Sequence, residues 1–73
     1  MKTQGEMIVT YIQLFGSITP MDAFRDLGIT KLATRVSELI RRGYVFKKTL
    51  ERSKNRFGKT VHYMRYELVE DNE

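Results

Sequence analysis

Residues 16–43 read GSITPMDAFRDLGITKLATRVSELIRRG, and this segment contains the start and stop signals of two consecutive helices. The first is expected over about residues 20–27, because a capping hydroxyl, a proline suited to the first helical position and a first-turn carboxylate occur at Thr19, Pro20 and Asp22. Gly28 should end this helix with a positive φ, which other residues adopt only at a cost. The second helix follows a short turn at Ile29 and Thr30, and this spacing predicts a helix-turn-helix motif.

The second helix of the motif is expected over about residues 31–42, capped by Thr30 and terminated by Gly43. Its apolar residues recur at helical spacing, which predicts a buried face made of Leu32, Val36, Leu39 and Ile40. The opposite face carries polar and charged side chains, Lys31, Thr34, Arg35, Glu38, Arg41 and Arg42. This division is typical of a helix that packs on one side and contacts a charged partner on the other.

The segment before the motif predicts a third helix. It is expected over about residues 3–15 and should stop at Gly16, because apolar side chains recur at helical spacing at Met7, Ile8, Tyr11, Ile12 and Phe15. Residues 17–19 are too few for a helix, and we expect them to form a short strand with Ile18 facing the core.

Beyond Gly43 the apolar period changes to about two, which predicts strands over residues 44–50 and 60–69. The connecting residues 51–59 contain polar turn formers and a glycine, so we expect them to be the loop of a hairpin. A β-hairpin after a helix-turn-helix makes the fold class α+β: a winged helix-turn-helix of three helices, a short strand and a C-terminal β-hairpin wing.

Length and composition favour a single domain over residues 1–73, with an ordered core at about 5–69 and an acidic tail at 70–73. The chain has no apolar run long enough to cross a membrane and no signal peptide at its start, which predicts a cytoplasmic protein. Without cysteine, and with His62 as its single histidine, it offers no disulfide, no thiol nucleophile and no histidine-rich metal site. No catalytic spacing is present, so we expect no enzyme and no cofactor.

The charge is distributed unevenly along the chain. The net charge is +4, but the segment from Lys31 to Arg65 contains eleven basic residues against two acidic ones, Glu38 and Glu51. The rest of the chain has two basic and seven acidic residues. A basic centre between acidic or neutral ends is the pattern expected of a nucleic-acid-binding protein.

These patterns predict a site for double-stranded DNA on two elements. The expected recognition-helix residues are Thr30, Lys31, Thr34, Arg35, Glu38, Arg41 and Arg42. Residues near the start of such a helix usually reach base edges, and Arg35 is suited to guanine, while Arg41 and Arg42 are better placed for phosphates. The expected wing residues are Arg52, Lys54, Asn55, Arg56 and Lys59, and their targets are phosphates or a minor groove. Phe57 in the same loop could be a packing residue, a wedge or a turn anchor, and packing is the favoured role.

The segments FGSITPMDA (15–23), LG (27–28), LATRVSELIRRGY (32–44) and NRFGK (55–59) resemble a family of small phage and prophage winged helix-turn-helix proteins. The resemblance covers about residues 5–69. It implies a phage or prophage origin, a winged-helix fold and DNA binding. It also implies contacts from Lys31, Thr34 and Arg35 on the helix and from Arg56 and Lys59 on the wing.

Three functions remain open from the sequence. The first is sequence-specific or architectural DNA binding by a transcriptional regulator or recombination accessory factor. The second is a small phage protein that binds and inhibits a host or phage protein through its basic face. Binding of double-stranded RNA is the weakest, because the major groove of A-form RNA is too narrow to admit a helix. Both a monomer and a homodimer are compatible with the sequence.

Overall fold

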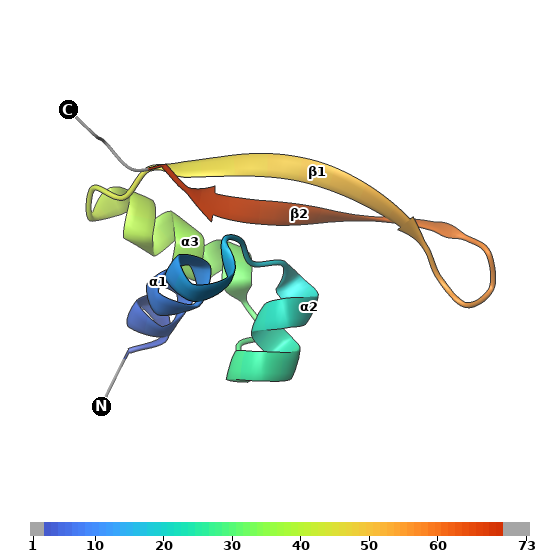
Figure 1. Cartoon of the computed structure of the whole chain (residues 1–73), viewed down its shortest axis with the longest axis horizontal. Helices are drawn as coiled ribbons and strands as arrows, with labels where there is room; N and C mark the ends of the chain where they lie inside the picture. Colours follow the sequence, from blue (N-terminus) through green and yellow to red (C-terminus); the bar gives the residue numbers. More distant parts are fainter. Residues whose placement is uncertain (1–2, 70–73) are drawn as a thin grey trace.

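The computed structural model describes residues 3–69, in which three helices precede a two-stranded antiparallel hairpin (Figure 1). The second helix begins with one α-helical turn, α2, and continues directly as a wider π-helical segment, η1. The elements are α1 (Gln4–Phe15), α2 (Pro20–Asp22), η1 (Ala23–Leu27), α3 (Leu32–Arg41), β1 (Phe46–Lys54) and β2 (Thr60–Leu68). This order confirms the predicted α+β arrangement with a helix-turn-helix and a C-terminal hairpin.

Capping boxes close the N-termini of α1 and α2. The Thr3 hydroxyl accepts a hydrogen bond from the Glu6 amide, and the Glu6 carboxylate accepts one from the Thr3 amide. Thr19 and Asp22 make the same reciprocal pair, at 3.1 Å in both directions. Each box satisfies two amides that a helix start leaves without a partner. The predicted helix start at residues 19–22 is confirmed, while Thr3 caps α1 and is not its first helical residue.

The predicted cap of α3 was wrong. Lys31 occupies the N-cap position, with no side-chain hydrogen bond to the helix, and Thr30 lies one residue too early. The reason lies in the turn, where Ile29 is buried and its amide donates to the Ala23 carbonyl at 3.0 Å. Because this contact holds the chain against η1, Thr30 and Lys31 are both needed to reach the first turn of α3. Gly28 has the predicted positive φ, at 70°.

The hairpin differs from the prediction at both ends of its first strand. The chain at Tyr44 is still bonded to α3, because its amide donates to the Leu39 carbonyl, so β1 begins at Phe46. At the far end β1 continues to Lys54, and the predicted loop 51–59 shortens to 55–59. The extra strand residues pair with β2 in the register Glu51↔Tyr63, Arg52↔His62, Ser53↔Val61 and Lys54↔Thr60. Cross-strand hydrogen bonds therefore outweigh the low β-propensity of the charged residues.

The short strand expected at residues 17–19 is a single bridge. Ile18 and Tyr66 exchange two backbone hydrogen bonds, of 3.0 and 2.9 Å, on the edge of β2 that β1 does not use. Ile18 faces the core, as predicted, and is fully buried. This bridge ties the hairpin to the segment between α1 and α2.

The core lies between α1, α3 and the base of the hairpin. Its buried members are Ile8, Ile12, Ile18, Ala23, Ile29, Leu32, Val36, Leu39 and Tyr66. Ile40 was predicted to join them but is 40% exposed. Successive helical residues are about 100° apart, so Ile40 lies beyond the edge of the stripe that Val36 and Leu39 bury. No helix within residues 3–69 combines the length and apolar character needed to cross a bilayer.

A small polar network joins α1 to η1 and predicts acid sensitivity. Asp26 accepts hydrogen bonds from Arg25 and from the Tyr11 hydroxyl, at 2.9 and 2.6 Å. These hydrogen bonds lower the pKa of Asp26 from 3.8 to about 2, and the bond from Arg25 has the largest effect. A carboxylate with a lowered pKa in the folded state adds stability above its unfolded pKa and loses it as the pH falls toward the folded value.

We therefore expect Asp26→Asn to lose less stability than the wild type when the pH falls from about 4 to about 2. Thermal unfolding followed by circular dichroism at several pH values measures this difference. Tyr11→Phe removes one of the two donors and should give an intermediate curve. Parallel curves for the wild type and Asp26→Asn would contradict the role given to this carboxylate.

Candidate nucleic-acid interface

The outward face of α3 is polar and narrow. Leu32, Val36 and Leu39 bury the opposite side of the helix. Helical spacing therefore places three exposed residues of α3 farthest from the core, Thr34, Ser37 and Arg41, while Thr30 is exposed in the turn before the helix. Ser37 was not among the predicted site residues, although its helical spacing from Thr34 and Arg41 could have identified it. This face offers hydroxyl groups with one cation at its C-terminal end.

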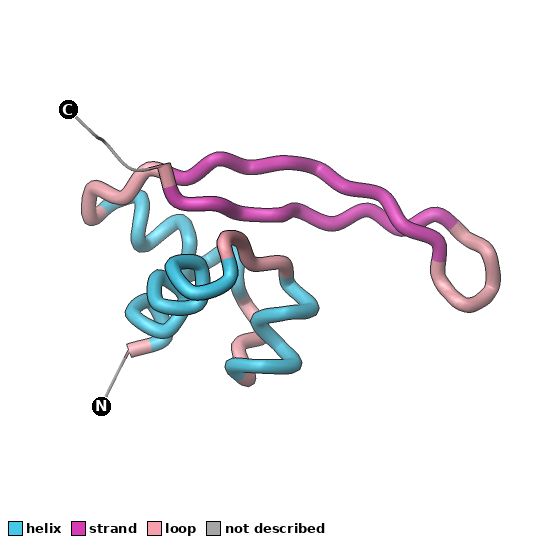
Figure 2. Tube along the Cα trace, in the orientation of Figure 1, coloured by secondary structure: helices cyan, strands magenta, loops and turns pink. Residues whose placement is uncertain are grey.

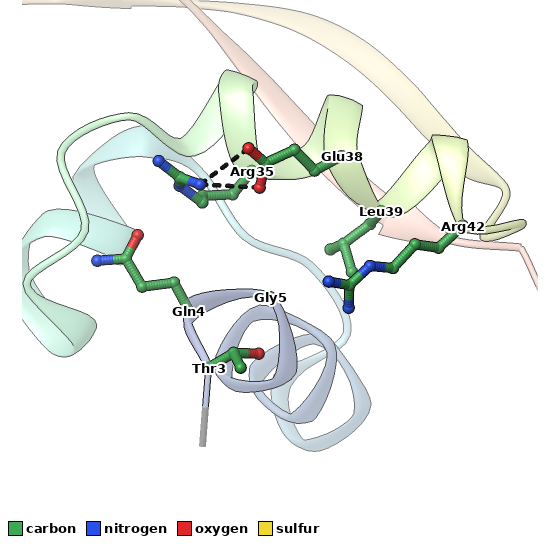
Figure 3. A pocket seen from close by; sticks show the side chains of 7 residues that line it. All are labelled: Thr3, Gln4, Gly5, Arg35, Glu38, Leu39 and Arg42. Carbon is green, nitrogen blue, oxygen red and sulfur yellow. Dashed lines mark hydrogen bonds and ion pairs between the residues drawn. The ribbon is translucent and has the colours of Figure 1, made fainter. Parts of the chain in front are cut away.

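Arg35, Glu38 and Arg42 lie on the flank of α3 that faces the start of α1. Together with Thr3, Gln4, Gly5 and Leu39 they line a pocket of about 330 Å³ (Figure 3). The two helices approach closely at Gly5, where a Cβ would lie 3.1 Å from Leu39 Cδ2, tighter than an ordinary contact. No pattern in the sequence indicated that α1 would approach this flank.

Within this pocket Arg35 is held by its neighbour on the helix. Arg35 Nη1 donates to both carboxylate oxygens of Glu38, at 2.8 and 3.0 Å. Arg35 Nε is buried and has no hydrogen-bond partner, and the side chain as a whole is 32% exposed. Glu38 therefore holds Arg35 in place along the helix. Arg35 would have to leave Glu38 to place its guanidinium fork on a base.

The hairpin carries a row of cations toward its free end. Lys48, Arg52 and Lys54 alternate along β1 and share one face, and all three are exposed. Arg56 and Lys59 continue the charge into the loop at residues 55–59, which Figure 2 shows at the end of the hairpin remote from the helices. Arg52 and Lys54 were expected in the loop but belong to the strand, where the sheet fixes their direction.

Asn55 shapes the loop. Its side-chain oxygen accepts hydrogen bonds from the amides of Phe57 and Lys59, at 2.9 and 3.1 Å. Its own amide donates to the Lys59 carbonyl at 2.9 Å. Such a side chain mimics a backbone turn. Asn55, which was expected to contact DNA, thus has its side-chain oxygen engaged within the protein.

Arg65 belongs to the basic segment but is used internally. It donates to Glu51 at 2.9 Å and to the Ser17 hydroxyl at 2.8 Å, which joins both strands to the segment before α2. The hydrogen bond with Glu51 raises the pKa of Arg65 and lowers that of Glu51. This pair stabilises the base of the hairpin and leaves little of Arg65 for a partner.

Ion pairing separates two classes of cation. Within residues 3–69, the arginines with carboxylate partners are Arg25, Arg35 and Arg65. The other basic side chains of this part form no ion pair, and we call them the unpaired cations: Lys31, Arg41, Arg42, Lys47, Lys48, Arg52, Lys54, Arg56 and Lys59. All of them belong to α3, its flanking residues or the hairpin.

The sequence was also compared with known proteins. Over residues 3–71 it matches the model of one family, described as a winged helix-turn-helix domain. The chain belongs to this family. No curated protein and no solved structure matches it.

In this winged helix-turn-helix domain, α2 with η1 and α3 form the motif, and the β1–β2 hairpin forms the wing. The domain class typically binds double-stranded DNA and is not catalytic, with the second helix of the motif as its recognition element. Among the described side chains, no cluster of three or more His, Asp or Glu residues could hold a metal ion. The chemistry on offer is that of hydroxyls, guanidiniums and ammonium groups, which suits phosphate and base contacts.

Proposed function

We propose that this chain binds double-stranded DNA, with α3 in the major groove and the hairpin along the phosphate backbone or an adjacent minor groove. The observation that carries the proposal is the distribution of the unpaired cations. They gather on the two elements that a winged helix presents to DNA, and the one basic residue of 3–69 that lies elsewhere, Arg25 on η1, is paired with Asp22 and Asp26. Cations without a carboxylate partner are available to neutralise phosphates, which supplies most of the affinity of such proteins.

Different residues of α3 and its flanks are assigned to base contacts and to phosphate contacts. Thr34 and Ser37 on α3, with Thr30 in the turn before it, are exposed and are assigned to base edges, where a threonine can contact a thymine methyl or form a hydrogen bond. Arg41 and Arg42 are assigned to phosphates, together with Lys31 at the start of the helix. Arg35 remains with Glu38 and adds its charge at the flank beside α1.

The proposal extends to a transcriptional regulator or recombination accessory factor of phage or prophage origin, acting in the cytoplasm of a bacterial host. It rests on the segments that resemble small phage proteins and on the polar outward face of α3, which can distinguish base pairs. One copy of the chain, or each copy in a homodimer, would cover one half-site, because it offers one recognition helix.

A salt titration tests the proposal. Binding to mixed-sequence duplex DNA, measured by fluorescence anisotropy, should fall steeply as the salt concentration rises, with log K decreasing by about 0.9 per phosphate contacted for each tenfold increase. Absence of binding at low salt would overturn it. A stoichiometric complex with a protein partner that forms without DNA and survives high salt would instead favour the inhibitor function.

Exchanges on α3 should separate base contacts from phosphate contacts. Once a preferred duplex has been selected, Thr34→Ala is expected to reduce the preference over mixed sequence by about tenfold, the lower part of the range for one base contact. Arg41→Ala should weaken both duplexes similarly and reduce the salt slope by about 1. Thr49→Ala, an exposed threonine in the middle of β1, is the matched control and should change neither quantity. Unchanged preference in Thr34→Ala would remove Thr34 from the site.

A further inference from the structure

The tip of the hairpin carries a large apolar side chain with nothing to pack against. Phe57 is 87% exposed, more than any other large hydrophobic residue in the described part of the chain. Packing was the role favoured for Phe57 from the sequence, and this prediction was wrong because the hairpin carries the loop beyond the helices, so that no core surface lies beneath it (Figure 1). An aromatic ring held in water has an unsatisfied driving force for burial.

The loop holds Phe57 in a defined position. Asn55 accepts from the Phe57 and Lys59 amides, and the Gly58 amide donates to the Asn55 carbonyl at 3.0 Å. Gly58 has φ of 79°, a conformation that glycine adopts without strain. A loop closed by four hydrogen bonds loses little conformational freedom on binding, so its residues are prepared for contact.

The surroundings of Phe57 indicate which partner the ring meets. Arg56 precedes it, Lys59 follows two residues later, and Lys54 lies at the end of β1; all three are exposed unpaired cations. No acidic residue occurs between Arg52 and Thr60. An apolar ring among cations suits a surface with phosphates around an apolar interior, and stacked bases between two phosphate backbones provide one.

We propose that Phe57 is a wedge that enters the minor groove and unstacks one base step of the DNA bound by the hairpin. Apolar side chains inserted in this way kink the duplex by about 20–90°. Arg56 and Lys59 would hold the phosphates on either side while the ring contacts the bases. The chain would then bend DNA, with a preference for flexible pyrimidine–purine steps, which unstack most easily. This inference rests on the proposed function and adds an architectural activity to it.

Fluorescence energy transfer between dyes on the two ends of a duplex of about 30 base pairs measures the bend. The duplex contains one central TA step with 2-aminopurine as its purine, and the protein is added to saturation. The wild type should shorten the end-to-end distance and raise the 2-aminopurine fluorescence, as unstacking does. Phe57→Ala should lose most of both signals and bind about tenfold more weakly, a moderate loss for one stacking contact.

Two variants and a stability measurement serve as controls. Phe57→Leu retains an apolar wedge and should keep most of the bend. Leu14→Ala truncates another exposed apolar side chain, on α1 and outside the hairpin, and should keep the wild-type affinity and the wild-type bend. All three variants should unfold at the wild-type temperature, because these side chains are exposed and outside the core.

The outcomes separate the wedge from DNA binding itself. Equal bending and equal 2-aminopurine fluorescence for the wild type and Phe57→Ala, with binding intact, would overturn the wedge and leave the proposed function standing. A wild type that binds the duplex without bending it would have the same consequence and would point to a protein pocket as the site for Phe57. If the wild type does not bind duplex DNA at any salt concentration, the proposed function fails and the wedge fails with it.

Discussion

Alanine at Arg52, Lys54, Arg56 and Lys59 together is expected to weaken binding to mixed-sequence duplex DNA by about a thousandfold at 0.1 M salt. The four side chains are unpaired cations of the wing, so each can release a counterion from one phosphate. With a slope of about 0.9 per phosphate, losing four contacts should make the dependence of log K on log salt shallower by about 3.6. Fluorescence anisotropy at several salt concentrations measures both quantities.

Two controls distinguish lost contacts from lost charge. Arg52→Lys with Arg56→Lys conserves the charge of the wing and should retain the wild-type salt slope. Arg25→Ala removes a cation from η1 that is paired with Asp22 and Asp26, and it should leave the slope unchanged. If the fourfold variant kept the wild-type slope, or if Arg25→Ala reduced it equally, the wing would not be the phosphate-binding element.

The parts of the fold that local chemistry determines could be predicted from the sequence. The helix start at Thr19 and Pro20 needs only a hydroxyl, a proline and a carboxylate within four residues. The stop at Gly28 needs only the positive φ that glycine allows. The buried stripe of α3 follows from helical spacing alone, apart from Ile40 at its edge. Each of these signals operates over one or two turns of the chain.

The parts that depend on distant contacts could not be predicted. Helical spacing placed Arg35 among the outward residues, but the approach of α1 at Gly5 turns that flank into a pocket. The extension of β1 to Lys54 depends on its partner strand, since Glu51 and Arg52 have little preference for a strand on their own. Phe57 looked like a packing residue because its sequence neighbours do not show whether a surface lies beneath the loop.

Tyr66→Ala is expected to reduce the free energy of unfolding by about 3–5 kcal/mol, the usual cost of removing a buried aromatic ring. A chain of this size has a total stability of roughly 4–11 kcal/mol, at about 0.05–0.15 kcal/mol per residue. The ring is buried in the core and packs edge-to-face against Phe46, with 6.4 Å between the ring centroids. It lies at the residue through which β2 bridges Ile18. Removing it therefore leaves a cavity between the hairpin and the helices. Urea unfolding followed by circular dichroism measures the loss.

Tyr66→Phe is the matched control, because it keeps the ring and removes only the hydroxyl. Its stability at neutral pH should stay within about 1.5 kcal/mol of the wild type, the usual limit for a substitution that conserves the buried volume. Burial raises the pKa of Tyr66 above 10.0, so the folded state favours the neutral phenol. The stability that the neutral phenol contributes is fully present below the unfolded pKa and is lost as the pH rises through the folded pKa. Above pH 10, Tyr66→Phe should accordingly lose less stability than the wild type.

Tyr66→Ala also tests whether the core fixes the orientation of the wing for DNA binding. The hairpin is held against the helices by the Ile18–Tyr66 bridge and by the Tyr66 ring. The hydrogen bonds from Arg65 to Ser17 and Glu51 add to this attachment. At temperatures where Tyr66→Ala is still folded, a loosened base should lower DNA affinity even though every unpaired cation is present. Wild-type stability in Tyr66→Ala would show that the ring is not part of the core. Wild-type affinity with reduced stability would show that the wing binds phosphates without a fixed orientation relative to α3.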